Sequence, residues 1–177
     1  MQNKLTKTEH YSPAEDTLFF ANQIQNEKGK YALDIGTGSG YLAKVLLANF
    51  ELVVATDTSF EATKKAHSVI DNCLCCDSAD AMVAEFDLVV CNLPYLPSNE
   101  ITDSTVDGLH EGVVIPLKII KSAKSVTKKG GRLLFLTSSL ANYEELIKQT
   151  QSLGLRTKII AKKKMFFEEL ILVEATK

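Results

Sequence analysis

Short apolar runs alternate with amphipathic segments along the whole chain, with no internal repeat and no low-complexity linker. We predict that seven of these runs are strands, because they are rich in β-branched and aliphatic residues and most are bounded by Gly, Asp, Asn or Pro. The predicted strands are 31–35, 52–56, 73–76, 86–91, 132–137, 157–161 and 170–174.

Helical periodicity marks segments between these strands. The positions that share a helical face are Leu42, Val45 and Leu46, then Val113, Leu117 and Ile120, and finally Leu146 and Ile147. Near the N-terminus, the run Ser12-Pro13-Ala14-Glu15 is typical of a capping box with Pro13 at the first helical position. Leu18, Phe19 and Ile24 are predicted to form the buried side of that first helix.

The alternation of strand and helix indicates parallel strands joined by right-handed crossovers. Only residues 162–169 separate the last two strands, which is too short for such a crossover and predicts an antiparallel hairpin. We therefore predict a doubly wound α/β fold: a seven-stranded, mostly parallel sheet with a C-terminal antiparallel hairpin and helices on both faces. The third strand, 73–76, is predicted to lie at one edge.

The amino-acid composition of the chain argues against several classes of function. With 177 residues, 45% apolar residues and a net charge of −2, the chain is expected to be one soluble domain spanning 1–177. No apolar run approaches the ~20 residues of a membrane helix. The near-neutral net charge argues against a protein that binds the phosphate backbone of nucleic acid through overall positive charge. The spacing of the four cysteines does not suit a disulfide framework, which favours a reducing, cytoplasmic setting.

A glycine-rich turn follows the first predicted strand. Asp34 precedes Gly36, Gly38 and Gly40, but Tyr41 stands where a dinucleotide fingerprint requires another small residue. A carboxylate at Asp34 would repel a pyrophosphate, whereas it suits a cationic or amino-bearing ligand. The sequence therefore favours a ligand of that kind.

Two further carboxylates follow the second and third predicted strands. Asp57 stands where an acidic side chain accepts hydrogen bonds from ribose hydroxyls in related sheets. Asp77 is placed to accept one from an adenine amino group. Asp residues also end strands for purely structural reasons, but three strand ends in this order around a glycine turn favour a ligand site.

The fourth strand leads into Asn92-Leu93-Pro94-Tyr95. The Asn92 amide oxygen and the Leu93 carbonyl can jointly accept hydrogen bonds from a planar –NH2 group, Pro94 stiffens the turn, and Tyr95 can cover the flat face of that group. This turn predicts a cradle for an amide or an aromatic amine.

These motifs resemble those of the class I S-adenosylmethionine-dependent methyltransferases that modify amide or exocyclic nitrogen. Together with the run Ser12-Pro13-Ala14-Glu15-Asp16-Thr17, they are similar to the HemK-like protein-glutamine methyltransferases, which act on the Gly-Gly-Gln motif of peptide-chain release factors. Because only about 30 residues precede the first predicted strand, the chain is most similar to the archaeal and eukaryotic branch, which lacks an N-terminal helical domain.

The resemblance implies S-adenosylmethionine as cofactor and a contribution to the site from residues 1–30. No metal site is expected, because in a strand Cys73 and Cys75 point to one face and Cys76 to the other and cannot converge on an ion. The implied catalytic residues are Asn92, Leu93, Pro94 and Tyr95, and the implied cofactor-binding residues are Thr17, Asp34, Gly36, Gly38, Gly40, Asp57, Asp77, Ser78 and Asn92. It also implies a class I release factor as substrate and a small zinc-binding activator protein, which we expect to dock on the edge of strand 73–76.

Alternatives stay open at this point. The family's usual Asn-Pro-Pro-Tyr has Leu93 in place of its first proline, and Asn-Leu-Pro-Tyr also occurs in ribosomal-RNA adenine dimethyltransferases, so an adenine amino group of RNA or DNA is a second substrate class. A non-catalytic scaffold is a third reading. The segment 107–112 only loosely matches the family's glycine-rich loop. Glu15 serves either as part of the capping box or as a ligand contact, and the first is favoured.

Overall fold

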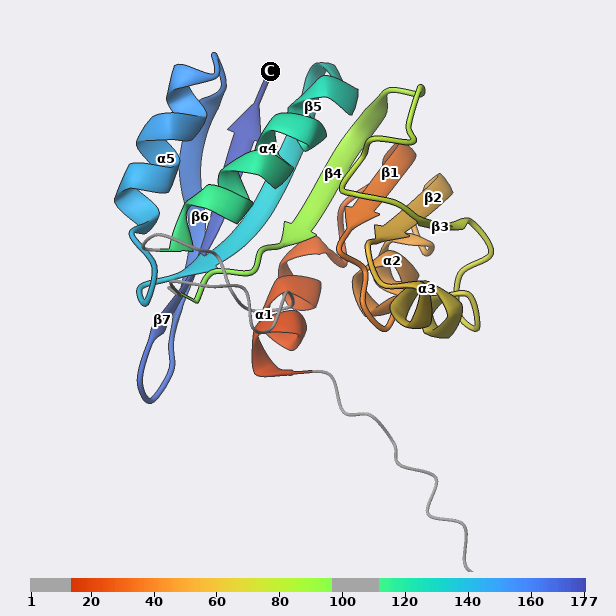
Figure 1. The fold of residues 1–177 in the computed structure, drawn as a ribbon, viewed down its shortest axis with the longest axis horizontal. Helices are drawn as coiled ribbons and strands as arrows, with labels where there is room; N and C mark the ends of the chain where they lie inside the picture. The colour runs from red at the N-terminus through yellow and green to blue at the C-terminus, as the bar shows by residue number, and fades with distance from the viewer. Residues whose placement is uncertain (1–13, 97–111) are drawn as a thin grey trace, which may run out of the picture.

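The computed structural model describes residues 14–96 and 112–177, and its strands form one sheet in the order β3-β2-β1-β4-β5-β7-β6 (Figure 1). The strands are β1 Gly29–Ile35, β2 Phe50–Asp57, β3 Cys73–Cys75, β4 Phe86–Asn92, β5 Thr127–Ser138, β6 Arg156–Lys164 and β7 Glu169–Thr176. The first five pair in parallel, and β7 runs antiparallel to both β5 and β6. The predicted fold class and the edge position of the third strand are confirmed.

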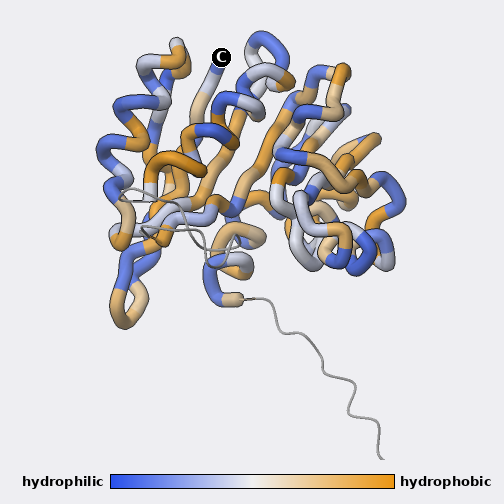
Figure 2. The backbone as a smooth tube through the Cα atoms, viewed as in Figure 1, coloured by the Kyte–Doolittle hydropathy of each residue, from blue (hydrophilic) through white to orange (hydrophobic). Residues whose placement is uncertain are grey.

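Helices cover both faces of this sheet. In the described part of the chain they are α1 Glu15–Ile24, α2 Tyr41–Leu46, α3 Phe60–Ala66, α4 Val114–Val126 and α5 Tyr143–Ser152. Alternate side chains of β5 explain why both faces need covering: Leu134 and Leu136 pack with α1 and α2, whereas Leu133 and Phe135 pack with α4 and α5. Figure 2 shows the result as hydrophobic strands between helices of mixed character.

The beginning of α1 differs from the prediction. The described helix starts at Glu15 with Ala14 as its N-cap and no side-chain cap, later than the predicted start at Pro13. Ser12 and Pro13 of the predicted capping box lie outside the described residues. The Glu15 carboxylate pairs with Lys163 of β6, a contact distant in the sequence. Leu18 is exposed rather than buried, and Phe20 takes its place in the core.

The C-terminal hairpin places its turn beside the functional edge of the sheet. Ser138, at the end of β5, pairs with Leu170, and Lys164 pairs with Glu169. The turn between β6 and β7 therefore lies at the edge where the parallel strands end, and Figure 1 shows the hairpin extending beyond it. The loosely matching segment 107–112 lies outside the described residues, apart from Gly112. None of the described helices is long and apolar enough to cross a bilayer.

Candidate active site

A cavity of about 510 Å³ opens where β1, β2 and β4 end, a volume typical of small-molecule sites. Topology puts it there, because the carboxyl ends of parallel strands meet at one edge and their loops face the same space. The lining residues that were predicted from the sequence are Thr17, Gly36, Gly38, Asp57, Asp77, Ser78, Asn92, Leu93 and Pro94. Among those predicted, Asp34, Gly40 and Tyr95 do not line it.

Asp34 lies beneath the glycine turn and holds it in shape. Its Oδ2 accepts hydrogen bonds from Thr37 Oγ1 at 2.7 Å and from the Ala43 amide at 3.1 Å, whereas Oδ1 has no partner among the described residues. Complete burial raises the pKa of the Asp34 carboxyl from 3.8 to about 6, although these two hydrogen bonds lower it. A positively charged ligand above the turn would favour its ionised form.

The glycine turn leaves open space for a ligand. Gly36 and Gly38 both have positive φ, and a Cβ atom added at either would meet nothing within 4 Å. The turn is fastened to β2, because the Gly36 and Thr37 amides both donate to the Thr56 carbonyl, at 2.8 and 2.9 Å. The backbone can therefore approach a bound molecule closely without losing its own support.

The two carboxylates on the far side of the cavity already have protein partners. Asp57 Oδ2 accepts from the Gly38 amide at 2.9 Å and its Oδ1 accepts from the Ser59 amide at 2.8 Å. Asp77 accepts from the Ser78 hydroxyl and forms an ion pair with Lys118 of α4. The Lys118 ammonium group, with the Ser78 hydrogen bond, holds the pKa of Asp77 below its usual range.

Asn92 is oriented by Asp16 of α1, a residue distant in the sequence. Its Nδ2 donates to Asp16 Oδ2 at 3.0 Å, and the Thr17 amide donates to Asp16 Oδ1 at 2.5 Å. Because the amide nitrogen is engaged, Asn92 Oδ1 is left as a buried acceptor with no partner among the described residues. The side chain can therefore accept a hydrogen bond from a ligand's N–H group.

The turn after Asn92 is supported from two directions. Burial raises the pKa of Tyr95, as do the carboxylates of Glu168 and Asp16, so its hydroxyl stays protonated and hydrogen-bonds to Glu168. Gly112 packs against the same turn, because a Cβ atom there would lie 2.2 Å from the Tyr95 carbonyl oxygen. Only glycine fits at this position.

Several residues at the site were not predicted. Asp16 was noted only as part of a motif, and Lys118 belongs to a helix that was recognised only by its apolar face. Ile115, Lys118 and Ile119 of α4 line the cavity together, and their i, i+3, i+4 spacing is the one signal that links them. The remaining unpredicted lining residues are Ile35, Thr37, Ser39, Tyr41, Leu42, Thr58, Ser59 and Ala62. The half-buried or exposed cysteines 73, 75 and 76 have free thiols, and the described residues contain no metal-binding cluster.

Sheet order, antiparallel hairpin and a glycine-turn cavity together define the class I methyltransferase architecture. A family model described as "Methyltransferase small domain" matches residues 13–167. The chain belongs to this family, and the predicted membership of the class I methyltransferases, in their HemK-like group, is confirmed.

Individual relatives agree with this family. A Methanocaldococcus jannaschii protein assigned as a protein N5-glutamine methyltransferase is 29% identical over 180 residues, covering 94% of this chain and 91% of the relative. The solved Mtq2–Trm112 complex of E. cuniculi is described as responsible for methylation of the eRF1 termination factor. One of its chains has the same fold, with a TM-score of 0.80 and 24% identity. The match covers 94% of this chain and 98% of that one. The N-methyltransferase NodS of Bradyrhizobium japonicum, solved with S-adenosyl-L-homocysteine, has a TM-score of 0.63 at 15% identity over 91% of this chain and 85% of its own.

Proposed function

We propose that this protein transfers a methyl group from S-adenosylmethionine to the side-chain amide nitrogen of glutamine in the Gly-Gly-Gln motif of a peptide-chain release factor. The observation that carries the proposal is the buried Asn92 Oδ1, an acceptor held in place through Asp16 and without a partner among the described residues. The M. jannaschii and E. cuniculi relatives, assigned to glutamine and eRF1 methylation, support this substrate.

The cofactor fits the donor set around the cavity. The buried Asp34 carboxylate beneath the glycine turn suits a cationic ligand, Gly36 and Gly38 leave room for its chain, and Asp57 lies where it can accept from ribose hydroxyls. Asp77 would accept a hydrogen bond from the adenine amino group, and its ion pair with Lys118 would then be partly lost. Thr17 and Ser78 complete the lining. When bound, S-adenosylmethionine supplies an activated, electrophilic methyl group.

The residues of the Asn92–Tyr95 turn supply orientation rather than acid–base chemistry. An amide nitrogen is a weak nucleophile because its lone pair is delocalised. Hydrogen bonds from its N–H groups to Asn92 Oδ1 and to the Leu93 carbonyl would direct the lone pair and stabilise the positive charge that develops on nitrogen. Holding the nitrogen in near-attack geometry is worth roughly 7–11 kcal/mol. Pro94 stiffens the turn, and Tyr95, whose phenol is uncharged, lies at its end.

We further propose that β3 pairs with a strand of a small activator protein, as the Trm112 partner of the E. cuniculi structure suggests. The two edges of the sheet differ in their protection. The β6 edge carries several lysines and a register shift between Ile159 and Ala161, whereas β3 is a three-residue strand without a charged side chain. Charges, bulges and short length all discourage strand pairing, and because β3 is protected by its short length alone, it is the better candidate to accept a partner strand. Because the proposed substrate is a translation factor, we also propose that the protein acts in the cytoplasm.

The deciding experiment is a methyl-transfer assay with tritiated S-adenosylmethionine, in which the intact protein receives the release factor and total RNA in parallel reactions. The matched control is a release factor whose motif glutamine is replaced by alanine. We expect label on the wild-type factor and none on the replaced one. Label on RNA alone would contradict the proposal and favour an adenine amino group as the acceptor.

A further inference from the structure

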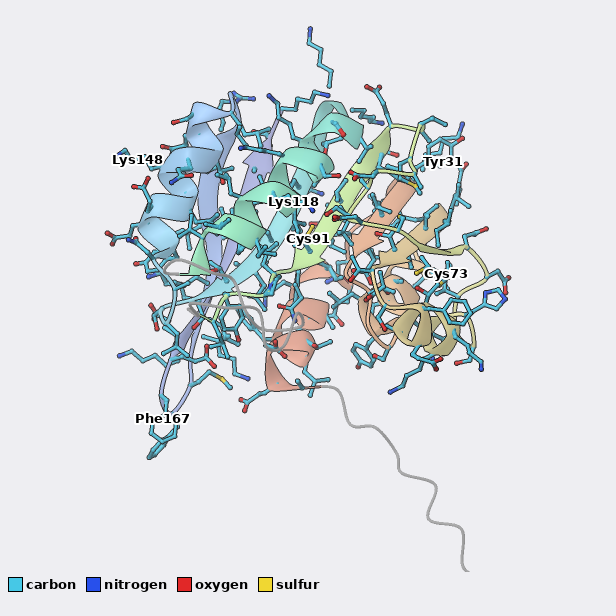
Figure 3. All side chains as sticks on the ribbon, in the orientation of Figure 1. Tyr31, Cys73, Cys91, Lys118, Lys148 and Phe167 are labelled. Carbon is cyan, nitrogen blue, oxygen red and sulfur yellow. The ribbon has the colours of Figure 1, made fainter. Side chains whose placement is uncertain are left out.

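The tip of the β6–β7 hairpin exposes two aromatic side chains that the fold does not use. Phe166 is 92% exposed and Phe167 85%, whereas Phe60, the next most exposed phenylalanine of the described residues, is 67% exposed. The two rings lie 4.6 Å apart in an edge-to-face arrangement. Figure 3 shows Phe167 at the extremity of the hairpin, directed away from the body of the protein. Contiguous exposed apolar groups of this kind mark interaction sites.

The residue that follows this tip contacts the turn after Asn92. Glu168, the residue after the pair, accepts a hydrogen bond from the Ser138 hydroxyl at the end of β5 and is hydrogen-bonded to the Tyr95 hydroxyl. Phe167 and Phe166 therefore stand one and two residues away from a side chain that touches the Asn92–Tyr95 turn.

The hairpin also contacts the helix that carries Asp16. Lys163 Nζ pairs with Glu15 Oε1 of α1 at 2.7 Å, and Lys162 Nζ bridges to Glu169 Oε2 across the hairpin at 3.0 Å. The Met165 amide donates to the Glu168 carbonyl at 2.8 Å and closes the turn. Because α1 also carries Asp16, the partner of Asn92, one helix links the tip to the catalytic turn.

We propose that Phe166 and Phe167 form the docking contact for the protein substrate, by binding an apolar patch on its surface beside the glutamine that enters the site. This inference rests on the proposed function and names the surface through which its substrate is recognised. Aromatic side chains supply a large share of the binding energy at protein interfaces, and a hairpin held in advance loses little entropy on binding.

The charges around the tip favour a protein over a nucleic acid. Of the three lysines that precede the tip, Lys162 and Lys163 are each paired with a carboxylate and Lys164 is exposed, so the run offers little net charge to a phosphate backbone. The two phenyl rings pack edge to face against each other instead of presenting a parallel platform for bases. An apolar protein surface is the match for such a tip.

The test compares steady-state methylation of the intact release factor by the wild-type protein and by the double variant Phe166→Ser, Phe167→Ser. Docking energy that is equal in the ground state and the transition state changes KM and leaves kcat alone. We expect KM for the release factor to rise about 10-fold or more, with kcat and the Kd for S-adenosylmethionine unchanged within about 2-fold. The variant Phe166→Leu, Phe167→Leu, which keeps apolar area, should recover most of the loss.

Val83→Ser is the matched control, because Val83 is fully exposed. It lies just before β4, at the end of the sheet where the parallel strands begin and not where they finish. It should leave both constants unchanged. An unchanged KM in the serine double variant would overturn the docking role alone, provided that wild-type protein labels the factor. Failure of the wild-type protein to label the factor would overturn the proposed function and the docking role together. Methylation of RNA that depends on Phe166 and Phe167 would overturn the assignment to a protein substrate.

Discussion

Asn92 Nδ2 donates a hydrogen bond to Asp16 Oδ2 at 3.0 Å, although 76 residues separate the two in the chain. The bond decides which end of the Asn92 amide faces the ligand, because the nitrogen is occupied and Oδ1 remains available. Without it the amide could turn over and present a donor where the substrate nitrogen needs an acceptor. Asp16 is thus a positioning residue that acts through Asn92.

Asp16→Ala should therefore lower kcat by roughly 10- to 100-fold, less than the loss of a group that contacts the reacting atoms. The Kd for S-adenosylmethionine should stay within a few-fold of wild type, as measured by isothermal titration calorimetry. Glu15→Gln is the control, because Glu15 is the neighbouring carboxylate and its ion pair lies on the surface, where such pairs contribute little. If Glu15→Gln lowered kcat as much, the loss would reflect general charge and not the orientation of Asn92.

Asn92→Ala removes the acceptor itself. We expect kcat to fall about 10²- to 10³-fold, the typical cost of removing one group that stabilises a developing charge. Binding of S-adenosylmethionine should be nearly retained, because the glycine turn, Asp57 and Asp77 remain. Single-turnover transfer to the release factor measures the first effect and calorimetry the second. Activity close to wild type would refute the cradle.

The sheet could be predicted because the signals for it are local. Apolar runs such as 86–91 and 132–137 fall within β4 and β5, and the short segment 162–169 indicated the hairpin. Strand ends were predicted too short where the chain carries polar residues, as at the beginning of β5, Thr127–Ser138, which starts with Thr-Lys-Lys-Gly-Gly. Only Thr127 of these residues has a strand partner, Phe86, and the register then shifts so that Leu88 pairs with Arg132. Residues 128–131 therefore form an irregularity within β5, and such an irregularity has no local signature.

The residues of the site likewise fall into those that the sequence could predict and those that it could not. Asp57, Asp77 and Asn92 could be placed together, because each follows a parallel strand and topology brings those ends to one edge. Asp16 and Lys118 could not be assigned roles, since their partners, Asn92 and Asp77, lie far away in the sequence. The ion pair between Glu15 and Lys163 of the last hairpin could not be predicted for the same reason.

Leu74 offers a test of the activator edge. Leu74→Lys places a charge on β3 and should reduce co-purification with the activator protein at least about 10-fold, since lysines on an edge oppose strand pairing. Ile160→Lys is a close control, because both side chains are 38% exposed and Ile160 lies on the opposite edge strand, β6. Equal co-purification of both variants would contradict docking on β3.

Asp34 links the ligand site to the pH dependence of stability. Its pKa in the folded protein is about 6, above the 3.8 of an unperturbed carboxyl. The folded state therefore binds this proton more tightly than the unfolded state, so the contribution of Asp34 to stability is present below pH 3.8 and is lost as the pH rises through 6. By the same relation, the free energy of unfolding of the wild-type protein should fall by about 2 kcal/mol between pH 4 and pH 8 relative to Asp34→Asn.

Urea unfolding of both proteins at pH 4 and pH 8 measures this difference. The quantity to compare is the change in the free energy of unfolding between the two pH values. The cost of burying the amide introduced by Asp34→Asn is the same at both pH values and cancels. Asp71→Asn, which neutralises an exposed carboxylate, is the control for the loss of one negative charge. The same Asp34→Asn variant should bind S-adenosylmethionine more weakly at pH 8, because the buried charge that favours a cationic ligand is gone. A variant whose stability followed the wild-type pH profile would show that Asp34 does not titrate near pH 6. Unchanged affinity of Asp34→Asn for S-adenosylmethionine at pH 8 would contradict the proposed electrostatic role beneath the glycine turn.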